Sequence, residues 1–364
     1  TILELALFYH NRNRNKEAIE LLESGPKKLL NKLWSAYLKK DTSDLSILVD
    51  SSIAFVFPFR NESLELLHWV EKNSTSWKAK YLLALNYLGK SQWDKGVEIF
   101  KNIGFTPKES LFYFIRGMLF QNRDIKGYEK DLQFAYKGEP KNWRYALALS
   151  EEFLNADKTK EALAIIKKTF KQNPKNYFAG MLLAKIYNEQ EDYEKSIELL
   201  KTLKILPYEH ATEGRRIYTK AYVGSALKKI AEGNYDFAAQ RLNSSLLWPE
   251  NLGVGKPFDP EERWERFLLA FLKQEKGEKS TIELQQISEF SLKHLSKPSR
   301  KHLLGVYAIQ QVHGKEEALE FVAQLLESKH GTSKLTKELT QFYFENSLIK
   351  WDKQFIEKLA AFLK

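Results

Sequence analysis

Apolar residues recur along most of this chain at intervals of three and four positions, the spacing that places side chains on one face of an α-helix. Three central stretches share a longer pattern, in which two such segments are followed by a proline: 77–107, 143–174 and 177–207. Because proline cannot continue a helix, each stretch predicts a pair of helices that ends there. The four prolines from Pro107 to Pro207 are 33, 34 and 33 residues apart, so we expect a tandem array of helical pairs.

One position in each helix of these pairs is small. The residues there are Ala84, Ser150 and Ala184 in the first helix of a pair, and Gly96, Ala162 and Ser196 in the second. Small side chains let two helices approach closely, and a large residue four positions after the second one, such as Phe100 or Ile166, fills the groove beside the contact. The pattern therefore predicts closely packed helical pairs.

A unit of about 34 residues with these small positions, an aromatic residue three positions after the first and a closing proline resembles the tetratricopeptide repeat. The resemblance implies an all-α fold, a right-handed superhelical solenoid, in which we expect about nine or ten helical pairs. It is strongest over residues 77–249. We expect degenerate helical repeats in 1–76, regular repeats in 77–249 and, after a loop at 249–261, degenerate repeats in 250–364.

Two segments fit this repeat less well. In residues 110–142, Gly117 fits, but Glu129 stands where a small residue belongs. Residues 44–60 are rich in β-branched and aromatic residues and on propensity alone could form a buried strand. A lone strand would have no partner in a helical array, so we prefer a buried helix that ends before Pro58.

The regular spacing breaks once within the strongest region, because Pro207 and Pro249 are 42 residues apart. The extra residues lie at 207–216, and a second irregular stretch with several Pro and Gly follows at 249–261. Both stretches connect the second helix of one repeat to the first helix of the next. Since successive repeats stack in parallel, such connections lie on one edge, on the order of 10 Å apart, and we expect the two loops to be neighbours.

These two loops carry aromatic and charged side chains rather than the Ser and Gly expected of a tolerated insertion. The candidate residues are Tyr208, Glu209, His210, Glu213, Arg215 and Arg216 in the first loop, and Trp248, Asn251 and Lys256 in the second. Two interpretations stay open: plain surface loops, or a site that binds a ligand or docks a domain.

The loop sequences also resemble a narrower group of proteins. The residues that carry this resemblance are Pro207, Tyr208, Glu209, Glu213 and Gly214, followed by Pro249, Glu250, Asn251, Leu252, Gly253, Gly255 and Lys256. They are similar to the C-terminal tetratricopeptide region of large bacterial proteins whose N-terminal domain, of unknown function, resembles the β-sandwich of carbohydrate-active enzymes. The resemblance implies a bacterial protein in which loops 207–216 and 249–260 face an upstream domain or complete a glycan site. The sequence does not distinguish a cytoplasmic from a periplasmic location. Because the chain begins with Thr1 rather than Met, we expect a fragment of a longer protein.

Solenoids of the kind that the first resemblance implies bind partners in a concave groove lined by the first helix of each repeat. Most of the lining positions are apolar, although Glu151 and Lys185 occupy two of them. The predicted groove residues are Tyr81, Leu85, Phe114, Met118, Leu147, Phe178, Met181 and Val223. Basic residues such as Lys78 and Lys220 form a margin. An apolar groove open to water is a liability, so we expect a protein to cover it: a peptide, the upstream domain, or the solenoid itself.

The composition excludes several kinds of chemistry. With no Cys, the chain has no disulfide, thiolate metal site or cysteine nucleophile, and its seven His show no metal-ligand spacing. Glu209 and Glu213 form a carboxylate pair, but Glu residues four apart are common on exposed surfaces. We therefore predict a fragment without catalytic residues, metal ions or cofactors.

The net charge of +10, from 57 Lys and Arg against 47 Asp and Glu, brings nucleic acid into consideration. Helical-repeat RNA readers use polar side chains in the groove, whereas most of these positions are apolar here and the Lys residues alternate with acidic ones. We predict no nucleic acid partner. We also predict no membrane span, because the longest apolar stretch, 45–59, is interrupted by Asp50 and Pro58 and is shorter than the ~18 to 20 residues required.

Overall fold

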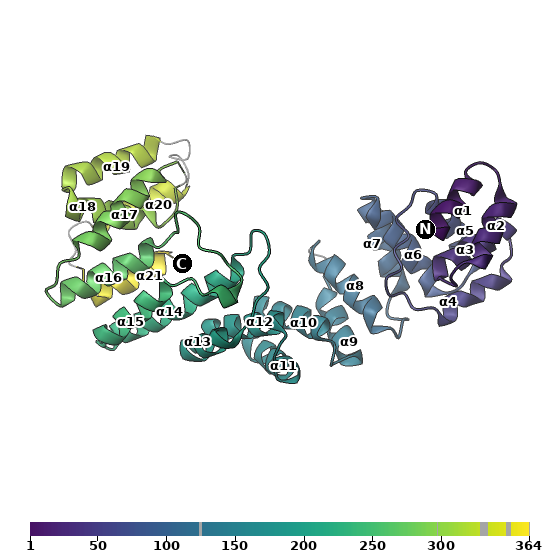
Figure 1. The fold of residues 1–364 in the computed structure, drawn as a ribbon, viewed down its shortest axis with the longest axis horizontal. Coiled ribbons are helices and arrows are strands. Elements are labelled where there is room, and N and C mark those ends of the chain that lie inside the picture. Colours follow the sequence, from purple (N-terminus) through teal and green to yellow (C-terminus); the bar gives the residue numbers. More distant parts are fainter. Residues whose placement is uncertain (124–125, 297, 328–333, 347–350, 364) are drawn as a thin grey trace. The chain divides into compact units, whose positions relative to one another are not determined.

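The computed structural model describes residues 1–123, 126–296, 298–327, 334–346 and 351–363. Over these residues the regular structure consists of 21 α-helices and two short 3-10 helices (Figure 1), which confirms the all-α prediction for this part of the chain. The chain divides into two compact units, residues 1–152 and 153–364. Each unit has its own buried apolar core.

The first unit consists of helical pairs that follow one another along the chain. Its helices are α1 (Ile2–His10), α2 (Asn15–Ser24), α3 (Leu29–Lys39), the short α4 (Ile47–Asp50), α5 (Ser63–Asn73), α6 (Trp77–Gly89), α7 (Trp93–Ile103), α8 (Ser110–Gln121), α9 (Tyr128–Gly138) and α10 (Trp143–Asn155), which runs across the boundary. Aromatic side chains join successive pairs: Trp77 and Tyr81 of α6 pack on Phe112 of α8, with ring centroids 5.1 and 6.0 Å apart.

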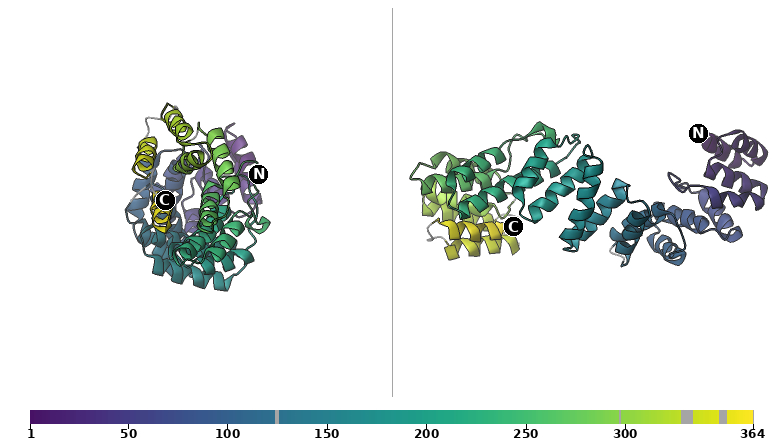
Figure 2. Two further views of the ribbon diagram at one scale, coloured as in Figure 1. Left: turned by 90° about the vertical axis from the view of Figure 1, so that its left-hand side faces the viewer. Right: turned by 90° about the horizontal axis from the view of Figure 1, so that it is seen from below.

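The second unit continues with the same kind of helical pair (Figure 2). Its helices are α11 (Thr159–Gln172), α12 (Tyr177–Glu189), α13 (Tyr193–Thr202), α14 (Glu213–Ala231), α15 (Tyr235–Ser245), α16 (Arg263–Glu275), α17 (Thr281–Lys293), α18 (His302–Val312), α19 (Lys315–Glu327), α20 (Lys334–Asn346) and α21 (Lys353–Leu363). Helix α14 has 19 residues. It includes the end of the predicted 207–216 loop, so Glu213, Arg215 and Arg216 lie in its first turn rather than in a loop.

Small side chains make the closest contacts within the helical pairs, as the sequence predicts. Gly96 of α7 is buried against α6, and a Cβ built on it would lie 2.6 Å from Leu88 Cγ and 3.1 Å from the Ala84 carbonyl oxygen. Ser196 of α13 is also buried, and its hydroxyl donates to the Ala184 carbonyl of α12 at 3.1 Å. Because interiors are close-packed, a larger residue at either position would push the two helices apart.

The pair α8–α9 makes a different contact from the predicted one. Helix α9 begins 18 residues after α8 begins, instead of the 16 in α6–α7 and α12–α13. Counted from the start of its helix, Asp131 therefore holds the position of Gly96, and the prediction that Glu129 does so was wrong. Asp131 is buried, and it accepts two hydrogen bonds from Arg116 of α8. This ion pair takes the place of the contact that a small residue makes in the other helical pairs.

The prediction of a buried helix, rather than a strand, that ends before Pro58 holds only for the first part of residues 44–60. A 3-10 helix, η1 (Ser43–Ser46), leads into α4, which ends at Asp50, and residues 51–62 form neither helix nor strand. The carbonyl groups of this segment are bonded by side chains of α6 instead of by a helix of their own. Lys78 Nζ donates to the carbonyl oxygens of Val49 (3.0 Å) and Ser51 (2.6 Å).

The other end of the irregular segment is held in the same way. Asn86, fully buried in α6, donates to the carbonyl oxygens of Pro58 and Arg60. Lys78 is buried too and forms an ion pair with Glu109 at 2.7 Å. The prediction that Lys78 belongs to a basic margin of the groove was therefore wrong. With its backbone fixed at both ends, the segment turns the side chains of Phe55, Phe57 and Phe59 toward solvent.

Candidate interaction surfaces

The two irregular loops of the second unit lie side by side, as the sequence predicts. We define the loop platform as residues 203–212 and 246–262. The Ile205 amide donates to the Asn251 carbonyl at 2.8 Å. The Asn251 side chain donates back to the carbonyl oxygens of Leu200 (3.0 Å) and Leu203 (2.8 Å). Asn251 thus bonds across the two loops through both its backbone and its amide.

Glycine makes the close approach of the loops possible. Gly253 has a φ of +66°, and a Cβ built on it would lie 2.9 Å from the Ile205 carbonyl oxygen. Gly214, at the start of α14, faces the Leu252 carbonyl oxygen, which a Cβ would approach to 2.6 Å. Only a residue without a side chain fits such contacts.

Arg215 and Trp248 hold the backbone of the second loop. Arg215 Nη1 donates to the carbonyl oxygens of Ser245 (2.5 Å) and Leu247 (2.8 Å), and its guanidinium lies 4.3 Å from the centre of the Trp248 ring. The Trp248 indole in turn donates to Glu262 at 3.2 Å. Arg215 and Trp248, both candidates from the sequence, therefore stabilise the loops.

Buried carboxylates neutralise the charge of Arg215. Glu265 is 1% exposed and one of its oxygens lies 3.6 Å from Arg215 Nη2. Burial raises the pKa of Glu265, while the nearby Lys301 and Arg215 oppose that rise. Glu262, also buried, pairs with Arg266 at 2.6 Å and lies 3.5 Å from Lys256, the last loop candidate of the second stretch.

The remaining loop candidates are exposed. Tyr208 is 61% exposed, and Glu209 and His210 beside it are almost entirely open to solvent, with Glu209 Oε1 3.6 Å from His210 Nε2. Glu213 and Arg216 lie 3.7 Å apart on the surface of α14. The structure thus separates the nine candidates: Arg215, Trp248 and Asn251 hold the platform, whereas the other six are exposed or partly exposed on the loops and on the first turn of α14.

The sequence analysis missed three apolar residues on the platform. Leu206 is 67% exposed, Leu247 61% and Phe258 99%. Single exposed apolar side chains are common on protein surfaces, whereas several together mark interaction sites. The signal was present in the sequence, because each of the three lies within or next to a segment that no helical period explains.

The predicted groove residues of the first unit differ in exposure. Tyr81 is completely buried, because Phe100 and Phe112 pack against its ring. The other four are half-buried at one face of successive first helices: Leu85 of α6, Phe114 and Met118 of α8, and Leu147 of α10. We call these four the apolar seam. Phe114 packs on Tyr145 of α10 with ring centroids 4.7 Å apart.

In the second unit the groove candidates are mostly covered. Met181 and Val223 are buried, whereas Phe178 is 42% exposed and stacks on Tyr177 with ring centroids 4.3 Å apart. Val223 belongs to the same apolar cluster as residues of α16, α18 and α21. These two side chains therefore contribute to the core in this structure.

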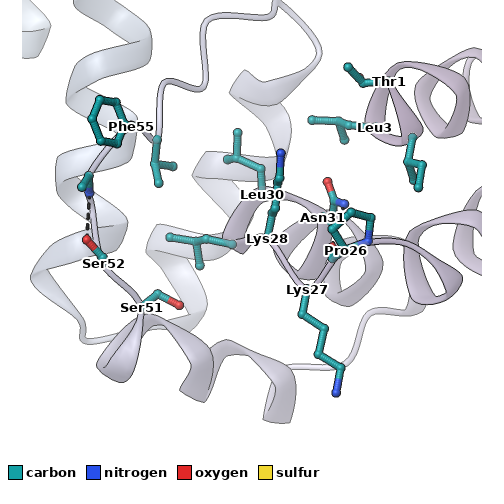
Figure 3. Close-up of a pocket in the computed structure, with 14 residues that line it drawn as sticks. Thr1, Leu3, Pro26, Lys27, Lys28, Leu30, Asn31, Ser51, Ser52 and Phe55 are labelled. Atoms are coloured by element: carbon teal, nitrogen blue, oxygen red, sulfur yellow. Dashed lines mark hydrogen bonds between the residues drawn. The ribbon is translucent and has the colours of Figure 1, made fainter.

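A cavity of about 640 Å³ opens beside the irregular segment of the first unit (Figure 3). Leu3, Pro26 and Leu30 line it together with Phe55, and the Lys27 and Lys28 side chains stand at its border. The Ala54 amide, which donates to the Ser52 hydroxyl at 3.1 Å, fixes the turn next to Phe55. This surface combines apolar contacts with positive charge.

Comparison with known proteins gives a limited picture. No protein-family model and no curated protein matches the chain. Among solved structures, a tetratricopeptide repeat protein from Parabacteroides merdae is similar over 74% of this chain and 100% of that chain, with 15% identity and a TM-score of 0.45. PilW, a widely conserved type IV pilus biogenesis factor, is similar over 68% of this chain and 99% of that one, with 12% identity and a TM-score of 0.38.

A third similar structure is the tetratricopeptide domain of P58(IPK), at 13% identity and a TM-score of 0.28 over 96% of this chain and 99% of that one. The helical pairs and their small contact positions establish the architecture independently. The described residues form a tetratricopeptide-like array.

The structure adds two observations on other kinds of site. Within the described ranges, which leave out His330, no group of three or more His, Asp or Glu is placed to hold a metal ion. None of the helices described is both long and apolar enough to cross a bilayer.

Proposed function

We propose that this chain is a non-catalytic interaction scaffold that binds a protein partner through apolar surfaces. The observation that supports it most is the loop platform, which presents Leu206, Tyr208, Leu247 and Phe258 to solvent on two loops bonded to each other. When the backbone beneath exposed apolar side chains is already fixed, binding needs to order the side chains alone and not the loop as well, and such preorganisation favours binding. Aromatic anchors in this arrangement are typical of binding hot spots.

The apolar seam of the first unit is a second surface of the same kind. All four of its residues are half-buried, and Leu85 and Phe114 pack against the core of the first unit. A peptide or an upstream domain of the same protein that contributes apolar side chains would cover it, as we expect for a groove of this type. The seam and the platform lie in different units, so each needs its own test.

The alternative of a glycan site completed by the two loops remains a weaker proposal. Arg215, Trp248 and Asn251 use their polar groups to hold the loops. The exposed side chains are mixed, with apolar Leu206, Leu247 and Phe258 beside charged ones such as Glu209 and Lys256. Glycan binding needs several polar groups that point toward the ligand. The platform is therefore better suited to an apolar protein surface.

Site-specific photocrosslinking in cells tests the proposal. A benzophenone amino acid replaces Phe258 or Tyr208 in the platform, and Phe114 or Met118 in the seam. The matched control replaces Ile282 of α17, which is 65% exposed but lies on neither surface. We expect one defined adduct from at least one surface and none from Ile282, with mass spectrometry identifying the partner. Equal crosslinking from all five positions, or no crosslinking from any of them, would contradict the scaffold proposal.

A further inference from the structure

Residues 49–60, which we call the phenylalanine segment, carry four large apolar side chains at the surface of the first unit. Val49 is 69% exposed, Phe55 94%, Phe57 57% and Phe59 69%. Single exposed apolar residues are common, whereas four in one short segment form a patch of the kind that marks an interaction site. None of the four belongs to the loop platform or the apolar seam, so this patch is a separate feature of the molecule.

The backbone of the phenylalanine segment is held from within the fold. Lys78 and Asn86 of α6 bond its carbonyl groups at both ends, and Ile53, which is 1% exposed, anchors its middle in the core. Phe55 has a φ of +59°, in the left-handed region that bulky residues rarely adopt, and its ring is nevertheless almost fully exposed. Neither feature stabilises the free chain, and backbone strain of this kind is typical of functional sites.

Positive charge without a carboxylate partner lies next to these rings. Lys27 and Lys28, in the connection between α2 and α3, are both exposed and border the same cavity as Phe55 (Figure 3). Neither lysine forms an ion pair with any described residue. Asp50 is the one acidic residue in the phenylalanine segment itself. The surface therefore combines apolar rings with unpaired positive charge, which complements an anionic surface that is apolar beneath.

The phenylalanine segment offers a partner few hydrogen-bonding groups. Besides the four carbonyl oxygens bonded by α6, that of Ile53 accepts from the Val56 amide at 3.3 Å and that of Phe57 from the Phe59 amide at 3.0 Å. Protein interfaces contain about one hydrogen bond per 100–200 Å². The boundary of a lipid bilayer needs none and penalises polar groups that lack a partner. The arrangement therefore favours a bilayer surface over a protein.

From these observations we propose that the phenylalanine segment binds the surface of a bilayer that contains anionic phospholipids. Phe55, Phe57 and Phe59 enter the boundary between headgroups and acyl chains, and Lys27 and Lys28 lie against the phosphate groups. In such peripheral attachment, burial of apolar side chains and attraction to anionic lipids act together, and no helix has to span the bilayer. The proposal rests on neither the loop platform nor the apolar seam, so its test can fail while the scaffold proposal stands, and the reverse.

Vesicle flotation of the full chain tests the proposal. The vesicles consist of phosphatidylcholine alone or of phosphatidylcholine with added phosphatidylglycerol. The chain is compared as wild type, as the triple variant Phe55→Ser, Phe57→Ser, Phe59→Ser, and as the double variant Lys27→Ala, Lys28→Ala. Circular dichroism establishes that each variant is folded.

Matched controls change the same number of exposed side chains in the second unit. The apolar control is the triple variant Ile282→Ser, Leu292→Ser, Phe344→Ser, at positions that are 65%, 49% and 58% exposed. The lysine control is Lys167→Ala with Lys168→Ala, at exposed positions of α11. Because the lysine control lowers the net charge by the same amount, it separates local attraction from the general effect of a basic chain.

We expect the wild type to bind anionic vesicles at least about tenfold more tightly than phosphatidylcholine vesicles. The phenylalanine variant should bind anionic vesicles at least about tenfold more weakly than the wild type. The Lys27, Lys28 variant should lose at least about fivefold, with a smaller loss at high salt. Both controls should match the wild type. A folded wild type that binds no vesicles, or a phenylalanine variant that binds them as well as the wild type, overturns the proposal.

An environment-sensitive fluorophore on a single introduced cysteine measures insertion directly, because the chain contains no Cys. Phe57→Cys carries the label in the phenylalanine segment, and Ile282→Cys carries it in the control. We expect anionic vesicles to shift the emission to the blue and to increase it at position 57, and to change neither at position 282. Vesicle binding with unchanged emission at position 57 would contradict insertion of the rings. A folded chain that binds no vesicles but crosslinks to a protein from position 57 in cells would assign the segment to a protein partner instead.

Discussion

Arg116 and Asp131 form a buried ion pair that joins the two helices of the pair α8–α9. Arg116 Nε and Nη2 lie 2.8 and 2.7 Å from the two carboxylate oxygens, and both side chains are less than 5% exposed. A third nitrogen, Nη1, donates to the Gly104 carbonyl at 2.6 Å. Where other pairs use a small residue, this one uses a charge pair that also reaches the end of α7.

Removing one partner of this pair should destabilise the first unit strongly. Asp131→Ala leaves the Arg116 charge buried without its carboxylate, and we expect a loss of about 3–5 kcal/mol in the free energy of unfolding. Urea denaturation, with hydrogen exchange of α8 and α9, measures it. Lys130→Ala, at an exposed neighbouring position, should change stability by no more than about 0.5 kcal/mol.

The double variant Arg116→Leu with Asp131→Ala separates charge from packing. Leu is the residue at the matching position of α6, Leu83, and Ala resembles Gly96 in size. We expect it to be clearly more stable than Asp131→Ala alone, because buried ion pairs contribute little beyond an apolar replacement of similar shape. A double variant as unstable as Asp131→Ala would show that the hydrogen bonds to the end of α7 matter more.

Two glycines of the second loop should respond differently to alanine. Gly253→Ala places a side chain at a φ of +66° and 2.9 Å from the Ile205 carbonyl, so we expect a loss of about 1–2 kcal/mol or more from the left-handed backbone alone. Gly255 has no atom within 4 Å of a built Cβ, and Gly255→Ala should be neutral or slightly stabilising. Limited proteolysis of the loops and thermal melting compare the two. Similar behaviour of both variants would contradict the platform contacts.

Variants of Arg215 and Phe258 should separate residues that stabilise the two loops from residues that bind the partner. Arg215→Ala removes donors from the carbonyl oxygens of Ser245 and Leu247, and we expect faster proteolysis of the loops and a lower melting temperature. Phe258→Ala removes a side chain that is 99% exposed and should leave stability within about 0.5 kcal/mol while weakening partner binding. A stability loss in Phe258→Ala would mean that this ring is part of the fold.

His302 should make the second unit sensitive to acid. It is 1% exposed, and burial, with the nearby Arg263, lowers its pKa from 6.5 to about 4. The Ser299 amide donates to its Nδ1 at 2.9 Å, which requires the neutral ring. Unfolded chains therefore bind more protons between pH 6.5 and 4, so stability is complete above that range and declines as the pH falls through it, by up to about 3 kcal/mol.

Urea denaturation at a series of pH values measures this decline. His302→Gln should remove most of it at the expense of stability at neutral pH, whereas His313→Gln, at an exposed position, should keep the wild-type profile. If His302→Gln showed an unchanged decline between pH 6.5 and 4, other groups would have to be responsible.

Local sequence patterns predicted much of the fold and part of the candidate surfaces. Positions such as Ala84 and Gly96 could be read directly, because they depend on residues in the same helical pair. The neighbouring loops could be inferred from repeat geometry, and Tyr208 was recognised as one of their residues. The roles of Arg215 and Asn251 could not be predicted, because their hydrogen bonds reach residues about 30 and 50 positions away.

The sequence by itself determined the helical pairs, because helix periodicity, small contact positions and closing prolines act over a few residues to a few tens of residues. Only the tertiary structure decided how Lys78 and Asn86 keep residues 51–62 out of a helix, and where α21 lies. These outcomes depend on two requirements. Buried polar groups need a hydrogen-bond partner, and the apolar face of a helix needs another apolar surface to pack against. Both requirements are met by residues distant in sequence, which no local pattern specifies.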